Sequence, residues 1–191
     1  MSIKKFSIYA SIILSFMVIA CIICCFIIIP TPIELKNEPT SITVYNYEIS
    51  STGVTATKTN TKANDFDKLY NEFINTTNFS VFERILTGAN IYKKPSQDVN
   101  QTKPTWSSAK SKAATIELSF KEKESIVVYV DGYSKKIDFY GLAMVVSSSL
   151  QVHEVSLYFK TTAGGTYTST PILIQMKTNK LYKQISTIDF K

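Results

Sequence analysis

The sequence predicts an α+β protein, in which one N-terminal transmembrane helix precedes a single domain of mostly antiparallel, meander-like sheet with two short helices packed on one face. Three observations predict this. Residues 6–29 are apolar, residues 64–88 contain two stretches with helical spacing, and residues 115–191 alternate apolar and polar side chains between turn signals. The expected divisions are a cytoplasmic tail (1–5), a signal-anchor helix (6–29), a Pro-containing linker (30–40) and an extracytoplasmic domain (41–191).

Residues 6–29 contain no charged residue, glycine or proline. At about 1.5 Å per residue, a helix of this length crosses a hydrocarbon core of roughly 30 Å. Lys4 and Lys5 precede the run without a neighbouring acid. Because lysines near a span stay on the cytoplasmic side, we expect a single-pass protein of the cell membrane with its N-terminus inside and its domain outside the cell.

Two other interpretations of this run are a cleaved signal peptide and a lipoprotein signal. A signal peptide has an apolar region of about 7–15 residues followed by a small-residue cleavage site. Residues 6–29 form a longer apolar run than that. Val18-Ile19-Ala20-Cys21 resembles a lipobox, in which Cys21 is lipidated and becomes the new N-terminus. Apolar residues continue after Cys21, whereas a mature lipoprotein normally begins with polar ones, so the span is favoured.

Small and sulfur-containing side chains within the span carry two further expectations. Ser7, Ser11 and Ser15 share one helical face, which would allow two helices to approach and form a weak homodimer; the alternative is that serine is simply well tolerated in spans. All three cysteines, Cys21, Cys24 and Cys25, lie in the run. The domain therefore has no disulfide and no cysteine metal site, which favours a bacterial surface with low thiol use.

The charge balance indicates the kind of partner. The formal net charge is +6, and leaving out Lys4 and Lys5 gives +4 for the chain beyond the span. A mild positive charge favours anionic partners, such as a cell-surface polymer or lipid head groups. A protein partner of unspecified chemistry is the other expectation. The predicted side of the membrane excludes nucleic acid.

Residues 41–88 should begin with strand and continue with two helices. Residues 41–50 alternate as a strand does, and residues 51–61 are either a second weak strand or a surface loop. Asn64 is expected to cap an amphipathic helix. A second helix should begin at the capping box formed by Ser80 and Glu83 and end near Gly88. The apolar face of the first helix comprises Phe66, Leu69, Tyr70, Phe73 and Ile74.

Residues 95–114 are polar and are expected to form a long loop, which is the best interaction candidate in the chain. The loop contains the only tryptophan, Trp106, together with Lys103, Lys110 and Lys112. An aromatic ring beside lysines can stack on a sugar or anchor a partner. The competing interpretation is that Trp106 packs back onto the core.

The remaining residues are expected to form antiparallel hairpins. Strands at 115–120 and 125–130 flank a charged turn at 121–124, and Asp131-Gly132 is a strong two-residue hairpin signal. Residues 141–146 are buried as strand or helix. Further strands run near 155–159 and 172–176 on either side of a turn at Gly164-Gly165, and residues 180–191 are either a strand or a short helix.

No motif indicates catalysis, a metal or a cofactor. His153 is the sole histidine and is expected to be a packed or surface residue. The sequence therefore predicts a non-enzymatic, membrane-anchored binding or assembly module. The alternatives are a surface hydrolase whose carboxylates Asp131, Asp138 and Glu154 converge, and a lipoprotein anchored through Cys21.

Overall fold

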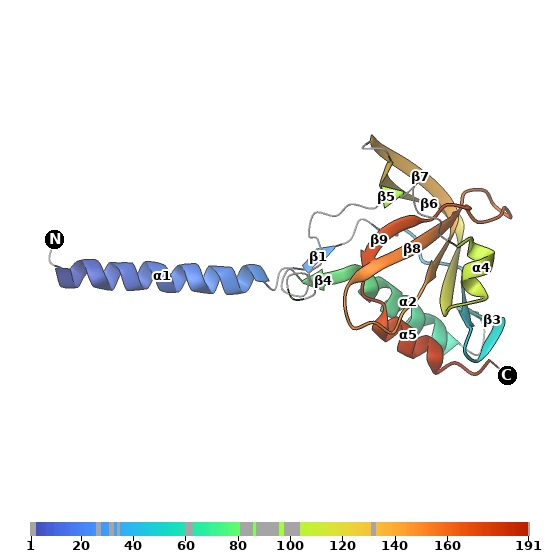
Figure 1. The fold of residues 1–191 in the computed structure, drawn as a ribbon, viewed down its shortest axis with the longest axis horizontal. Helices are drawn as coiled ribbons and strands as arrows, with labels where there is room; N and C mark the ends of the chain where they lie inside the picture. Colours follow the sequence, from blue (N-terminus) through green and yellow to red (C-terminus); the bar gives the residue numbers. More distant parts are fainter. Residues whose placement is uncertain are drawn as a thin grey trace.

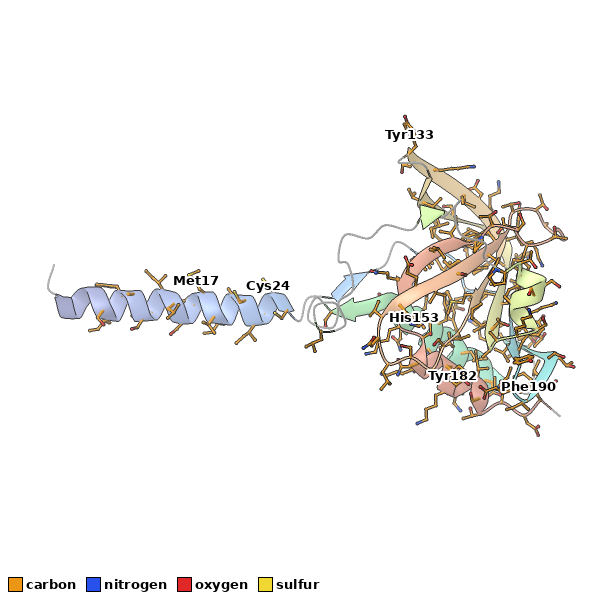
Figure 2. The ribbon with its side chains drawn as sticks, viewed as in Figure 1. Met17, Cys24, Tyr133, His153, Tyr182 and Phe190 are labelled. Atoms are coloured by element: carbon orange, nitrogen blue, oxygen red, sulfur yellow. The ribbon has the colours of Figure 1, made fainter. Side chains whose placement is uncertain are left out.

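A computed structural model of the chain describes residues 3–25, 28–30, 33, 35–59, 63–80, 86, 96–97, 104–130 and 133–190. Helix α1 (Ile3–Cys25) extends away from the domain (Figure 1). Its stretch from Ser7 to Cys25 is long and apolar enough to span a membrane or to act as a signal sequence, and none of it is buried inside the protein. In Figure 2, the side chains of α1 project freely all round the helix.

The helix ends at Cys25, before the apolar run does. Strand β1 (Ile28–Pro30) pairs antiparallel with β4 (Asn78–Ser80), with Ile29 opposite Phe79. The expected helix boundary at residue 29 is therefore wrong. β-Branched isoleucines and the following Pro30 favour extended backbone here.

The domain contains a mostly antiparallel sheet in which β6 is the central strand. The order is β3-β2-β6-β5-β9-β8-β7, and β6 also pairs with β7. The pairings β6–β7, β7–β8, β8–β9, β9–β5 and β5–β6 therefore close into a ring, with β2 and β3 attached to its side. The strands are β2 (Ser41–Asn46), β3 (Ser50–Thr57), β5 (Ser96–Gln97), β6 (Thr115–Val130), β7 (Tyr133–Val145), β8 (His153–Lys160) and β9 (Ile172–Met176).

Two helices cover one face of this sheet, namely α2 (Ala63–Thr77) and α5 (Asn179–Ser186) (Figure 1). The predicted apolar face of α2 is confirmed, since Phe66, Leu69 and Phe73 are at most 1 % exposed. Helix α2 already includes Asn64, which is therefore not its N-cap. Leu181 and Ile185 are fully buried, so α5 decides the open choice at residues 180–191 in favour of a helix.

The second helix expected at residues 80–88 is not the one that packs beside α2. Ser80 belongs to β4, and Leu86 is helical but 68 % exposed. Glu83, Arg84 and Gly88 lie outside the described residues. The helix that packs on α2 is α5, from the far end of the chain.

Strand β6 differs from the expected pair of strands joined by a charged turn. It is continuous from Thr115 to Val130, with a bulge between Ser119 and Glu124 in its pairing with β7. The hairpin prediction is confirmed, because Val130 pairs with Tyr133 across two intervening residues. Residues 141–146 were expected to be either strand or helix, and residues 141–145 belong to strand β7.

At the bulge, the side chain of Glu124 points into the domain and holds part of the segment that follows α1 and β1. Glu124 is 1 % exposed, and its carboxylate accepts hydrogen bonds from the backbone N–H groups of Lys36 and Asn37, both at 2.9 Å, and from Asn37 Nδ2 at 2.7 Å. Ile33 and Pro39 are buried nearby. The described part of the expected linker is therefore packed on the domain and does not stand clear of it.

Candidate binding cleft beside Trp106

Trp106 lies on the sheet face opposite α2 and α5. It begins the short helix α4 (Trp106–Lys110), whose first turn is capped by the Thr105 hydroxyl accepting from Ser108 N–H at 3.4 Å. Successive strand residues point to opposite faces, so Tyr158 contacts Trp106 while its neighbours Leu157 and Phe159 enter the main core. Helix α4 thus covers a second, smaller apolar cluster.

The indole of Trp106 is an internal anchor. It is 7 % exposed, and its ring centroid lies 6.1 Å from Tyr45, 5.7 Å from Tyr158 and 5.4 Å from Tyr167. The Tyr158 hydroxyl donates to the carbonyl of Pro104 at 2.6 Å, which fixes the start of α4. The burial of the indole favours the competing interpretation that Trp106 packs back onto the protein. Its part in binding stays a prediction, since Trp106 also lines a cleft.

The predicted lysines separate in the structure. Lys110 lies with Nζ 5.3 Å from the centroid of Tyr45 and borders a cleft beside α4. Lys112 is exposed and does not line this cleft, and Lys103 lies outside the described residues. Of the four predicted binding residues, the structure brings Trp106 and Lys110 together.

The cleft, called here the Trp106 cleft, has a volume of ≈ 470 Å³. This lies within the range of about 300–1,000 Å³ that is typical of small-ligand sites. It lies between α4 and the loop that joins β8 to β9. Its lining mixes one aromatic wall with hydroxyls and charges: Thr105, Trp106, Ser107, Lys110, Glu117, Lys160, Gly165, Thr166, Tyr167 and Ser169.

Glu117 and Lys160 form the charged part of this cleft. Lys160 Nζ lies 3.7 Å from Glu117 Oε1 and 4.9 Å from the centroid of the Tyr167 ring. The Tyr45 hydroxyl donates to Glu117 Oε2 at 3.4 Å. Glu117 is therefore occupied as an acceptor, whereas Lys110 and the lining hydroxyls can donate to a ligand.

Tyr167 closes the cleft against β7. Its hydroxyl is buried and makes no hydrogen bond of good geometry. Burial, and then the negative charge of Glu117, raise the pKa of Tyr167 well above the usual value for a phenol; the same two causes raise the pKa of Tyr45. A Cβ at Gly141 would lie 3.0 Å from the Tyr167 hydroxyl, so glycine in this strand is what allows the ring to approach.

Sequence reasoning missed Glu117, Lys160 and Tyr167. They come from two strands and a loop that are joined only by the fold, so no local spacing connects them. The one available signal was Glu117 itself, which stands between Ile116 and Leu118 and must face away from the core those residues enter.

The structure does not bring the predicted carboxylates together. Gly141 pairs with Lys160, and Asp138 and Glu154 extend from that pair in opposite directions, about 30 Å apart at the rise of a strand. Asp131 lies outside the described residues. His153 contacts the Gln151 carbonyl at 3.1 Å and the Thr178 hydroxyl at 3.5 Å, as a packed histidine does. Within the described ranges, no group of three His, Cys, Asp or Glu side chains is placed to hold a metal ion.

Comparison with known proteins adds no family. No protein-family model matches the chain, and no curated protein or solved structure matches it significantly.

Proposed function

We propose that the protein is a single-pass membrane protein that displays its α+β domain outside the cell as a non-enzymatic binding or assembly module. The N-terminus with Lys4 and Lys5 is cytoplasmic, and α1 is the anchor. The length of α1, its apolar composition and its lack of burial against the domain support this arrangement.

The observation that carries the binding role is the Trp106 cleft. Its free polar groups include several donors, since Lys110 and the lining Ser and Thr hydroxyls have hydrogens to give, while Glu117 already accepts from Tyr45 and faces Lys160. A lining rich in donors fits an anionic group, such as the phosphate of a cell-surface polymer. The net positive charge of the chain would raise the local concentration of such a ligand.

Binding is tested with the full-length protein in nanodiscs of neutral phosphatidylcholine, titrated calorimetrically with poly(glycerol phosphate) as the probe. Lys110→Glu should weaken binding at least fivefold, because it places a negative charge in the cleft. Lys112→Glu is the matched control, since it makes the same charge change two residues away and outside the cleft. Equal weakening by both variants, or no binding by the unaltered protein, would contradict the cleft as the site.

The topology is tested separately by adding a protease to intact cells that carry a C-terminal epitope. The epitope should be digested together with surface markers, while an N-terminal epitope survives. A protected C-terminal epitope would overturn the proposed orientation.

The lipoprotein alternative predicts a different N-terminus. In α1, Cys21 is exposed and lies within a continuous helix, as a membrane-spanning anchor requires. Mass spectrometry of the mature protein decides this point, because an N-terminal acylated Cys21 would exclude the span.

A further inference from the structure

A β-hairpin arm projects from the domain on the side of the molecule that carries β5 (Figure 1). It consists of residues 124–130 of β6 paired with residues 133–139 of β7. Tyr133 lies at its tip and is 80 % exposed (Figure 2). The arm continues the sheet beyond the point where β8 stops.

Strand β7 is paired on only one side along this arm. Its pairing with β8 covers Gly141 to Met144, opposite Lys160 to Leu157. Over the described part of the chain, residues 133–139 pair with β6 but have no strand on the other side. The N–H and C=O groups that point outward along this edge can therefore pair with an added strand.

The loop after β8 turns away from this edge. Thr162 accepts from Gly165 N–H at 3.1 Å, and Gly164 has φ of 72°, a conformation that glycine adopts without strain. The chain then folds back on β8, where Thr168 N–H donates to the Phe159 carbonyl at 2.9 Å. This return opens a space beside the arm instead of continuing β8 along it.

That space is a cleft of ≈ 450 Å³, called here the arm cleft. One wall is the free edge of β7, where the half-buried Ile137 provides apolar surface on which side chains of an added strand can pack; Phe159 and Ile172 border the cleft but are at most 2 % exposed. Hydroxyls line the opposite wall. The lining residues are Lys135, Lys136, Ile137, Asp138, Phe159, Thr161, Thr168, Ser169, Thr170 and Ile172.

The charged side chains of the arm determine which net charge an added strand should carry. Asp138 lies 3.6 Å from Lys123 Nζ and 3.7 Å from Lys136 Nζ, so two lysines already neutralise its carboxylate. Lys135 points to the other face of the strand, beside Ile137, so the described part of the arm carries Lys123, Lys135 and Lys136 against the one acid Asp138 that borders the cleft. An acidic segment is therefore favoured, and pairing with the same edge of a second copy is opposed because it would bring lysines together.

We propose that the arm cleft binds an extended, acidic segment of a partner protein, which adds a strand to the free edge of β7. Backbone hydrogen bonds to residues 133–139 supply the register. The side chains of the added strand on the face of Ile137 are apolar, and the alternate side chains are acidic and lie on the face of Lys136. This site is separate from the Trp106 cleft and does not depend on ligand binding there.

The test uses the full-length, ¹⁵N-labelled protein in neutral nanodiscs. The probe is a blocked heptapeptide of alternating Glu and Val, with a Lys and Val peptide as the charge control. The Glu peptide should shift and protect the backbone amides of residues 133–139, and the Lys peptide should bind at least tenfold more weakly. Methylating the backbone nitrogens on one edge of the Glu peptide should abolish binding, since a strand added by that edge loses its donors.

The variant K135E/K136E should weaken the Glu peptide at least tenfold. K180E/K183E on α5 is the matched control, with the same charge change at the opposite side of the domain, and it should change binding less than twofold. The proposal is overturned if both N-methylated peptides, one for each edge, bind as tightly as the unmethylated peptide. It is also overturned if the chemical-shift changes map to the Trp106 cleft. A response of the arm amides to protein concentration alone would indicate pairing between copies and would overturn it as well.

Discussion

The buried carboxylate of Glu124 joins two parts of the chain that are distant in sequence. It accepts from Lys36, Asn37 and the Asn37 side chain, and it lies in a bulge of the central strand β6. A buried carboxylate is stable only when its oxygens are well paired, and a bulge can redirect a side chain in this way.

Replacing this carboxylate tests its contribution. Glu124→Gln should lower the free energy of unfolding by about 2 kcal/mol, because the hydrogen bonds lose their charge and the new NH₂ group faces donors. Urea unfolding of the full-length protein in micelles measures this, and amide hydrogen exchange at Lys36 and Asn37 should accelerate. Glu122→Gln, an exposed change in the same strand, should stay within about 0.5 kcal/mol of the unaltered protein. Unchanged exchange at both amides would show that Glu124 does not hold this segment.

Tyr167 makes stability depend on alkaline pH. Its folded-state pKa is raised, by burial first and then by Glu117, so the folded protein retains a phenolic proton that the unfolded chain releases above about pH 10. The unfolded state then binds fewer protons, and stability falls as pH rises, by up to about 1.4 kcal/mol per pH unit for this one group. The stabilising difference is fully present below pH 10.

The Tyr167→Phe variant removes that proton. Urea unfolding from pH 8 to 11 should show a shallower loss of stability above pH 10 for this variant than for the unaltered protein. Tyr47→Phe, which removes a hydroxyl from a side chain that is 54 % exposed, serves as the control and should follow the unaltered protein. Parallel curves for all three proteins would contradict the burial of the Tyr167 hydroxyl.

At the residue scale, sequence patterns predict which side chains are buried when neighbours repeat the pattern, and fail when the partner is remote. Alternation predicted a strand within residues 41–50, and in the structure Ile42 and Val44 on one of its faces are buried. Glu124 stands in a run of alternating charges that predicts an exposed turn, and nothing local indicates that its donors come from residues 36–37. The burial of Trp106 could not be decided from the sequence for the same reason, since the tyrosines around it come from three other segments.

At the element scale, the long periodic elements were predictable and the shortest ones were not. Helix α2 and the β6–β7 hairpin follow from spacing and a turn signal within each segment. The two- and three-residue strands β1, β4 and β5 exist only because distant partners supply their hydrogen bonds. Helix α5 has only eight residues, and a sequence that short is compatible with strand until α2 is beside it.

The packing of α5 on α2 should therefore account for much of the stability of the helical layer. Leu181→Ala should lower the free energy of unfolding by about 3 kcal/mol, because it removes a fully buried side chain and leaves a cavity. Lys183→Ala, an exposed change two residues along the same helix, should cost less than about 0.5 kcal/mol. Urea unfolding in micelles provides the comparison, and a loss below about 1 kcal/mol for Leu181→Ala would mean that α5 is only loosely attached.

At the scale of the whole molecule, two successive contacts join the segment after helix α1 to the domain. The first is the β1–β4 ladder, which lies directly after α1 and ties it to the end of α2. The second is the Glu124 contact with residues 36–37. The ladder comes first along the chain, so in the proposed membrane-anchored protein it should set the height of the domain above the bilayer, while the Glu124 contact holds only the segment behind it.

Because of this order, the same insertion should have different effects on the height of the domain at two positions in the chain. A Gly-Ser-Gly-Ser insertion directly after Cys25 lies on the membrane side of the ladder and should let the domain move away from the bilayer by up to about 13 Å. The same insertion between Leu35 and Lys36 lies behind the ladder and should leave the height unchanged. A spin label at Tyr133→Cys, in a chain whose native cysteines are replaced by serine, reports the height through relaxation by Ni²⁺ chelated to lipid head groups. Equal displacement by both insertions would show that β1 does not hold the domain, because only a chain free of the ladder transmits added length from either position.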